Sequence, residues 1–203
     1  MIAKAHASIR PRRSFGFELA RFIFVGIYKL SGWKLHDAMP ADRKLVIIAA
    51  PHTSNWDLLT MLAVTLYYRV PVRWMGKKSL GQGPFGWVMR WWGLLAVDRQ
   101  QSTSIVDQVA QAYAQADEMA VVIAPEGTRS DVSAWKTGFH AIAVAAQVPI
   151  ALGFIDSEAK FAGVGGPFMP TGDYAVDMAA IGEFYATRLN NYSVPQPQPE
   201  TND

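Results

Sequence analysis

The sequence predicts a single α/β domain in which a largely buried mixed sheet is flanked by helices, with an amphipathic helix in front of it. Three observations support this prediction. The chain has 203 residues, of which 50% are hydrophobic, and this is enough for one sizeable core. Short continuous apolar runs recur, as expected for strands that are buried on both faces. Segments with helical apolar spacing lie between these runs, and this alternation is typical of α/β folds.

Three segments follow from composition and charge. Residues 1–31 comprise a basic arm and the amphipathic helix, and residues 32–192 form the folded domain. Residues 193–203 are a Pro-rich tail that is predicted to be disordered. Residues 1–44 contain nine Lys or Arg and three Asp or Glu. Residues 156–203 contain two Lys or Arg and seven Asp or Glu. The N-terminal end is therefore the end that we expect to meet an anionic surface.

The apolar stretch from Phe15 to Trp33 is not expected to cross a bilayer, because Glu18, Arg21 and Lys29 interrupt it. These charges fall within a sector about 80° wide on a helical wheel, and the rest of the helix surface is apolar and aromatic. One interpretation is a helix that lies in the membrane interface, with the basic arm at anionic headgroups. The alternative is that the helix packs on its own domain.

Strand and helix candidates follow one another along the domain. The strands expected are residues 44–50, 70–75, 94–97, 119–124, 148–155 and, as an edge strand, 161–164. The helices expected are one that ends near residue 69 and those of residues 85–92, 102–116, 139–147 and 174–190. Gly and Pro residues separate several of these elements, as at residues 81–84.

Cysteine is absent, which excludes thiol catalysis, thiolate metal sites and a disulfide framework. A Gly-x-Ser-x-Gly nucleophile elbow is also absent from the sequence. Both usual signatures of a nucleophile that carries an acyl group are therefore missing, and any acyl transfer is expected to be direct.

His52 lies where the strand of residues 44–50 passes into a helix, near the free backbone N–H groups of a helix start. Asp57 follows five residues later, and its carboxylate could accept a hydrogen bond from one imidazole nitrogen. The other nitrogen would then act as a base toward a substrate hydroxyl. A structural alternative is that Ser54 and Asp57 form a capping box and that His52 is an ordinary loop residue.

Basic residues follow the next two predicted strands. Lys77 and Lys78 come after the strand of residues 70–75, and Arg99 comes after the strand of residues 94–97. In open α/β sheets, ligands bind at the carboxyl ends of the strands. The alternatives are that the lysines form a solvated loop and that Arg99 pairs with Asp98.

The strand of residues 119–124 runs into Pro125-Glu126-Gly127-Thr128-Arg129-Ser130. Gly127 permits a tight turn or a close approach of the backbone to a ligand, and the planar guanidinium of Arg129 suits a phosphate. The structural alternative is that Glu126 and Arg129 form an ion pair.

These motifs, in this order, resemble those of the glycerolipid acyltransferase family that includes 1-acylglycerol-3-phosphate acyltransferase. The four motifs are His52-x-x-x-x-Asp57, which is similar to the catalytic HX4D motif, then residues 93–99 with the lysines before them, residues 125–130, and Val148-Pro149-Ile150. The resemblance covers approximately residues 30–190. The sequence departs from the commoner family wording at Pro51 and at Thr53-Ser54-Asn55-Trp56.

The resemblance implies a glycerolipid-acyltransferase-like fold and an O-acyltransferase of phospholipid biosynthesis. Such an enzyme moves a fatty acyl group from acyl-CoA or from the thioester of an acyl-carrier protein to the free hydroxyl of a lysophospholipid such as 1-acylglycerol-3-phosphate. It is expected to act peripherally on the cytoplasmic face of the membrane, without a cofactor, a metal or nucleic acid.

The resemblance also implies roles for particular residues. His52 would be the general base and Asp57 the carboxylate that orients it. The substrate-binding residues implied are Arg99 and Arg129, with Lys77 or Lys78, for the acceptor's phosphate, Glu126 and Gly127 for the shape of its glycerol site, and Thr128 in the same motif.

Two hypotheses from other classes stay open. A metal-dependent hydrolase would use His52, Asp57 and Glu126 as ligands of a divalent ion. A non-catalytic lipid-binding protein that docks on membranes would retain the N-terminal helix and an apolar groove. It would not need both His52 and Asp57, or both Glu126 and Arg129, to be intact.

Overall fold

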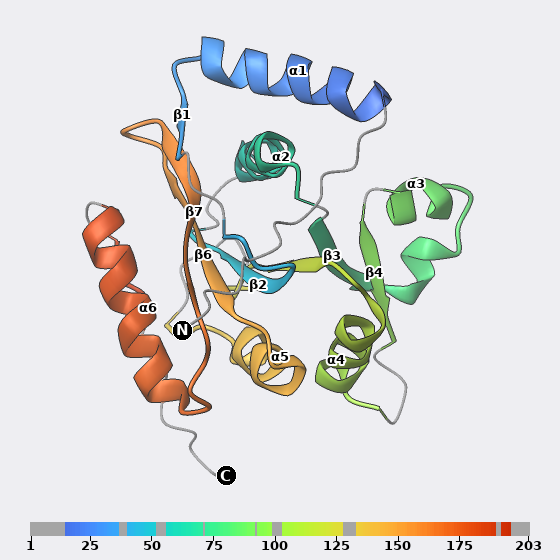
Figure 1. Cartoon of the computed structure of the whole chain (residues 1–203), viewed down its shortest axis with the longest axis vertical. Coiled ribbons are helices and arrows are strands. Elements are labelled where there is room, and N and C mark those ends of the chain that lie inside the picture. Colours follow the sequence, from blue (N-terminus) through green and yellow to red (C-terminus); the bar gives the residue numbers. More distant parts are fainter. Residues whose placement is uncertain are drawn as a thin grey trace, which may run out of the picture.

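The computed structural model describes residues 15–36, 40–51, 56–70, 72–91, 93–98, 103–127, 133–189 and 192–195, and these form a seven-stranded sheet with helices around it (Figure 1). The strands are β1 (Lys34–Leu35), β2 (Lys44–Ala49), β3 (Val72–Lys77), β4 (Leu94–Val97), β5 (Met119–Ile123), β6 (Ile150–Asp156) and β7 (Phe161–Phe168). Their order across the sheet is β1-β7-β6-β2-β5-β3-β4.

The sheet is mixed, as predicted. The strands β6 and β7 are antiparallel, and all other neighbouring strands are parallel. The prediction that residues 161–164 form an edge strand is wrong, because β1 pairs with β7 on its outer side. Lys34 lies opposite Phe161, and Leu35 lies opposite Ala162. Two paired residues are too few to produce a recognisable apolar pattern in the sequence.

Each face of the sheet carries its own hydrophobic cluster, because the side chains of a strand alternate between the two faces. In β2, Val46 and Ile48 belong to one cluster, whereas Leu45 and Ile47 belong to the other. All four side chains are at most 5% exposed. Burial on both faces explains why this strand is a continuous apolar run rather than an alternating one.

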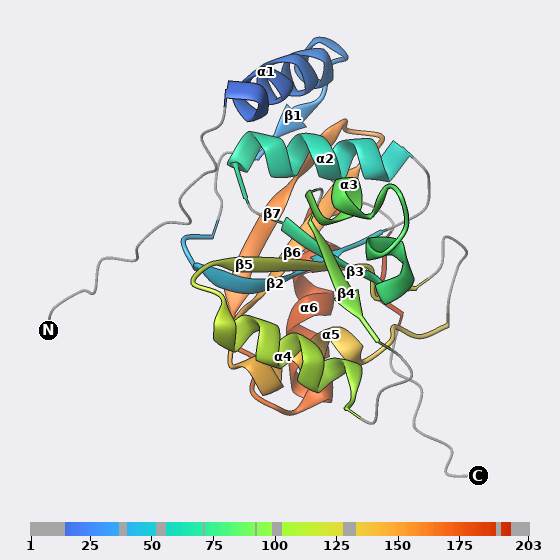
Figure 2. The same cartoon turned by 90° about the vertical axis from the view of Figure 1, so that its right-hand side faces the viewer.

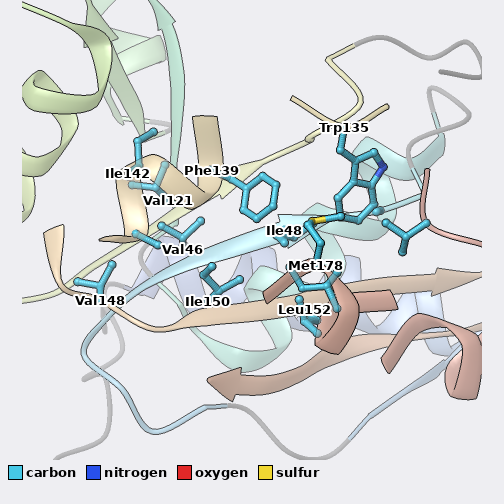
Figure 3. Packing of buried hydrophobic residues seen from close by; sticks show 14 of the residues in the cluster. Val46, Ile48, Val121, Trp135, Phe139, Ile142, Val148, Ile150, Leu152 and Met178 are labelled. Carbon is cyan, nitrogen blue, oxygen red and sulfur yellow. The ribbon is translucent and has the colours of Figure 1, made fainter. Parts of the chain in front are cut away.

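Helices cover both faces (Figures 1 and 2). The helices α1 (Phe15–Leu30) and α2 (Trp56–Tyr68) lie on one side, and α4 (Ile105–Gln115), α5 (Gly138–Ala146) and α6 (Tyr174–Arg188) contribute to the cluster on the other side. The short helices η1 (Lys78–Gly81) and α3 (Gly86–Trp91) follow β3. Figure 3 shows Phe139 and Ile142 of α5 and Met178 of α6 packed together with side chains of β2 and β6.

Side-chain caps determine where two of the helices begin. The Ser104 hydroxyl accepts a hydrogen bond from the Asp107 N–H at 3.1 Å, so α4 begins after Ser104 and not at residue 102 as predicted. The Asp173 carboxylate accepts hydrogen bonds from the backbone N–H groups of Ala175 and Val176 at 2.9 and 3.2 Å and so caps α6.

The helix α1 lies beside α2 (Figure 2), and Val25 of α1 belongs to the same hydrophobic cluster as Val64 of α2. The charged side chains of α1 also contact the domain. The Glu18 carboxylate accepts hydrogen bonds from Arg21 and from Arg69, which follows α2, each at 3.1 Å. The Lys29 ammonium lies 4.9 Å from the centre of the Tyr67 ring. The charges of this helix therefore point toward the domain, not away from it.

The opposite side of α1 is apolar and faces outward. Phe22 is 78% exposed and Leu30 is 89% exposed. The other exposed apolar side chains of this helix are Leu19, Ile23, Phe24 and Ile27. Among the described residues, no helix has both the length and the apolar character that are needed to cross a membrane. The helix thus packs on its own domain and also presents an apolar surface.

The chain remains packed after α6. Val194 is 6% exposed and belongs to the same core cluster as Val46 and Ile150. The packed chain therefore continues beyond the tail boundary predicted at Ser193. Residues 196–203 of the predicted tail lie outside the described residues.

Candidate active site

The carboxyl ends of β2, β3 and β5 lie at one edge of the sheet, because these strands are parallel neighbours. Ile48 near the end of β2 is opposite Ile123 at the end of β5, and Trp74 of β3 is opposite Val122. Three of the four predicted motifs therefore lie at this edge, whereas the fourth, residues 148–150, lies at the opposite end of the strands, because Ile150 begins β6 and is opposite Val46 near the start of β2. In open α/β sheets, this edge is the usual place for a ligand.

The HX4D segment joins β2 to α2. Ala50 is 1% exposed, and its N–H donates to the Gly153 carbonyl at 3.4 Å. Pro51 follows, His52 lies outside the described residues, and Asp57 is the second residue of α2. The predicted strand-to-helix junction is therefore present. The Asp57 side chain is also outside the part that the structure describes. Its hydrogen bond with His52 therefore stays a prediction.

Lys77 ends β3, and Lys78 begins η1. The Lys78 ammonium lies 3.3 Å from the Asp98 carboxylate, and the two side chains are 52% and 24% exposed. Asp98 therefore pairs with Lys78; Arg99, its predicted partner, lies outside the described residues. An exposed ion pair contributes at most about 1 kcal/mol, so Lys78 can exchange this partner for a phosphate at little cost.

Gln108 of α4 holds the chain just before Arg99. Its side-chain amide donates to the Asp98 carbonyl at 2.8 Å and accepts from the Asp98 N–H at 3.0 Å. Sequence reasoning did not identify this residue, because a glutamine on a polar helix face carries no functional signal. The two hydrogen bonds with Asp98 fix the backbone at the end of β4, where the second motif lies.

Glu126 and Gly127 form the turn that follows β5. Glu126 is 8% exposed, and its Oε1 accepts a hydrogen bond from the Tyr192 hydroxyl at 3.2 Å. The φ of Gly127 is 65°, which lies in the left-handed region that favours glycine. The other two residues predicted in this motif, Thr128 and Arg129, lie outside the described residues, as does the predicted ion pair of Glu126 with Arg129.

Lys136 is a cation at this turn that sequence reasoning missed. A Cβ atom on Gly127 would lie 2.6 Å from the Lys136 ammonium nitrogen and 2.8 Å from its Cε. The backbone N–H of Lys136 donates to the Pro125 carbonyl at 2.9 Å, so the two segments of the loop are joined. The absence of a side chain at residue 127 thus lets a lysine lie directly over the motif.

Tyr192 was also missed, because it lies 66 residues after Glu126 and was assigned to the end of the domain. Burial and then the nearby charge of Glu126 raise the pKa of Tyr192 above its ordinary value. The phenol therefore stays protonated and can donate its hydrogen bond to the carboxylate.

The structure does not describe the side chains of two of the three metal ligands in the hydrolase hypothesis, His52 and Asp57. Among the side chains that the structure describes, no three His, Asp or Glu residues gather in a way that could hold a metal ion. Glu126 belongs to these side chains, whereas those of His52 and Asp57 do not.

The fold and the site define an α/β domain that presents acidic and basic motifs at the carboxyl edge of its sheet, as a group-transfer enzyme would. A family model described as Acyltransferase matches residues 34–151, which is more than half of the chain. The chain belongs to the acyltransferase family, as its motifs predict.

Two curated relatives carry the name 1-acyl-sn-glycerol-3-phosphate acyltransferase. The protein from Haemophilus influenzae is 34% identical over 139 aligned positions, and the match covers 63% of this chain and 55% of the relative. The protein from Helicobacter pylori is 30% identical over 104 aligned positions, and the match covers 50% of this chain and 43% of the relative. The matched part thus spans about half the length of these relatives.

The fold is also similar to a solved structure, the 1-acyl-sn-glycerophosphate acyltransferase PlsC of Thermotoga maritima. The TM-score is 0.56 at 16% sequence identity, and the similarity covers 83% of this chain and 76% of that protein. The predicted acyltransferase-like fold is therefore confirmed.

Proposed function

We propose that this chain is an O-acyltransferase that moves a fatty acyl group from an acyl thioester to the free hydroxyl of a lysophospholipid such as 1-acylglycerol-3-phosphate. The observation that carries the proposal is the common edge of β2, β3 and β5, from which three of the family motifs start. The names of the two curated relatives support the same class of acceptor.

In the proposed reaction, His52 takes the proton of the acceptor hydroxyl as the hydroxyl oxygen bonds to the thioester carbonyl carbon. The C–S bond then breaks, so that an ester remains and the sulfur leaves with the proton from His52. Asp57 orients the imidazole and stabilises its protonated form. Backbone N–H groups after Pro51 would stabilise the charge that develops on the carbonyl oxygen.

The proposed acceptor site lies beside this base. Its cations are Lys77, Lys78, Arg99 and Arg129, and we add Lys136 to them because its ammonium lies over Gly127. Glu126, with Gly127 and Thr128, would contact the glycerol of the acceptor. A buried carboxylate that is already held by a donor suits this role, because it can bind a hydroxyl without first having to be ordered.

The acyl donor is acyl-CoA or acyl-carrier protein, and the reaction needs no cofactor and no covalent acyl-enzyme. The absence of cysteine supports direct transfer, because the most reactive nucleophile for an acyl-enzyme is missing. Both donors are cytoplasmic, so we place the reaction on the cytoplasmic face of the membrane.

Peripheral membrane binding through α1 is part of the proposal. Its outward face is apolar, whereas the charges of Glu18 and Arg21 are directed to the domain. A surface helix of a water-exposed domain has the reverse orientation. The outward face would enter the interface of an anionic bilayer, where the basic N-terminal arm adds electrostatic attraction.

A thiol-release assay tests the proposed function. Purified protein is incubated with acyl-CoA or an acylated carrier protein and with lysophospholipids that differ in headgroup. We expect thiol release that requires both substrates and persists in a chelator. Activity that a chelator removes and a divalent ion restores would favour the metal-dependent hydrolase. Vesicle binding without any thiol release would favour the non-catalytic lipid-binding protein.

A further inference from the structure

The segment after α6 returns to the active-site edge of the sheet. Leu189 at the end of this helix is 5% exposed, and Val194 is 6% exposed within the core cluster. Tyr192 lies between these two anchors, and its hydroxyl donates to Glu126 at 3.2 Å. The family model ends at residue 151, so this contact is a feature of the chain that the family match does not include.

Tyr192 belongs to an aromatic group that joins two parts of the site. Its ring centre lies 5.8 Å from that of Tyr185, which in turn lies 5.9 Å from that of Trp135. The Tyr185 hydroxyl donates to the Gly153 carbonyl at 2.8 Å. The same carbonyl accepts the Ala50 N–H, two residues before His52. The group thus contacts both the strand end that leads to His52 and the turn that carries Glu126.

The contact with Glu126 is suited to orienting a carboxylate. Glu126 is 8% exposed, so little water is available to replace a lost hydrogen-bond donor. The Tyr192 ring is fixed by the rings behind it, and the hydroxyl can therefore hold Oε1 in one place. Hydrogen bonds to charged groups are stronger than those between neutral groups.

We infer that Tyr192 is a positioning residue, whose hydroxyl holds the Glu126 carboxylate in the orientation that binds the glycerol of the acceptor. This inference rests on the proposed function, because it assumes that Glu126 contacts the acceptor. It assigns a role in acceptor binding to the C-terminal segment, which carries none of the family motifs.

Tyr192→Phe removes the hydroxyl and keeps the ring. We expect the KM for the lysophospholipid to rise about tenfold, as the loss of a hydrogen bond to a charged group implies, with the KM for the thioester unchanged. The control is Tyr174→Phe, because the Tyr174 hydroxyl is buried and has no hydrogen-bond partner among the described residues. This control should have the kinetics and the Tm of the unmodified chain.

The coupling to Glu126 is tested in a double-mutant cycle. In the Glu126→Ala background, Tyr192→Phe should cause no further rise in the acceptor KM. The inference is overturned if Tyr192→Phe changes both KM values equally and lowers Tm, since the role is then structural. It is also overturned if Tyr192→Phe has no effect although Glu126→Ala raises the acceptor KM. If Glu126→Ala itself leaves the acceptor KM unchanged, the proposed role of Glu126 fails as well.

Discussion

Asp177 is a carboxylate whose charge is stabilised inside the protein. It is 2% exposed, and it accepts hydrogen bonds from the Thr171 N–H at 2.9 Å and from the Thr171 hydroxyl at 2.9 Å. The Nε2 atom of His140 lies 2.7 Å from Oδ2 of Asp177, the same oxygen that accepts the Thr171 N–H. Burial alone would raise the pKa of Asp177, but the hydrogen bonds from Thr171 and His140 outweigh burial and lower it. The residue thus joins α5 to α6 through its ionised form.

The first prediction is that Asp177→Asn lowers the free energy of unfolding at pH 7 by about 2 to 4 kcal/mol. Because the folded pKa of Asp177 is below its ordinary value of about 3.9, this stabilisation is complete above pH ~4 and is lost as pH falls through the folded pKa. Denaturant unfolding should therefore show a smaller loss of stability below pH 4 in Asp177→Asn than in the unmodified chain. Asp173→Asn, which retains a capping side chain, should have little effect.

The second prediction concerns Gly127. Gly127→Ala and Gly172→Ala both place a side chain in the left-handed region, at φ values of 65° and 92°, and each should cost about 1 kcal/mol of stability. A Cβ at Gly172 meets nothing within 4 Å, whereas a Cβ at Gly127 displaces Lys136. Only Gly127→Ala should therefore raise the acceptor KM in steady-state assays. Equal kinetics of the two variants would show that Lys136 does not belong to the acceptor site.

At the scale of elements, the third prediction concerns the binding of α1 to membranes. Phe22→Glu places a charge on its outward face and should weaken binding to anionic vesicles at least tenfold, by roughly the free energy of burying one aromatic side chain. Val176→Glu is the matched control, because Val176 is 55% exposed on α6. High salt should weaken the binding of the unmodified chain without abolishing it. If Phe22→Glu co-sediments with anionic vesicles as well as Val176→Glu does, α1 is not the element that contacts the membrane.

Elements were predictable where the local sequence determines them. β2 and β5 appear as apolar runs because both of their faces are buried, and β4 was predicted with its observed bounds, Leu94–Val97. β7 was predicted too short, because Gly163, Gly165 and Gly166 interrupt its apolar pattern. β1 was not predicted at all. Its two residues are a strand only because β7 pairs with them, and such pairing depends on tertiary structure.

At the scale of the molecule, the sequence predicted which strand ends carry charged motifs but not which distant residues meet them. The motifs after β2, β3 and β5 converge because parallel strands align their carboxyl ends. Lys136 and Tyr192 reach the same edge through loop packing, and no spacing rule connects them to Glu126. The orientation of α1 was also not predictable, since a helical wheel defines two sides without saying which side the domain covers.

The central claim is that His52 drives direct transfer of an acyl group from a thioester to a lysophospholipid. It is tested most directly by measuring diacyl product by mass spectrometry together with released thiol, for the unmodified chain and for His52→Ala. We predict one diacyl product per thiol, and a loss of about 10²-fold to 10⁴-fold in His52→Ala with unchanged Tm. Thiol release without diacyl product, or a His52→Ala variant that retains most of the activity, would contradict the account.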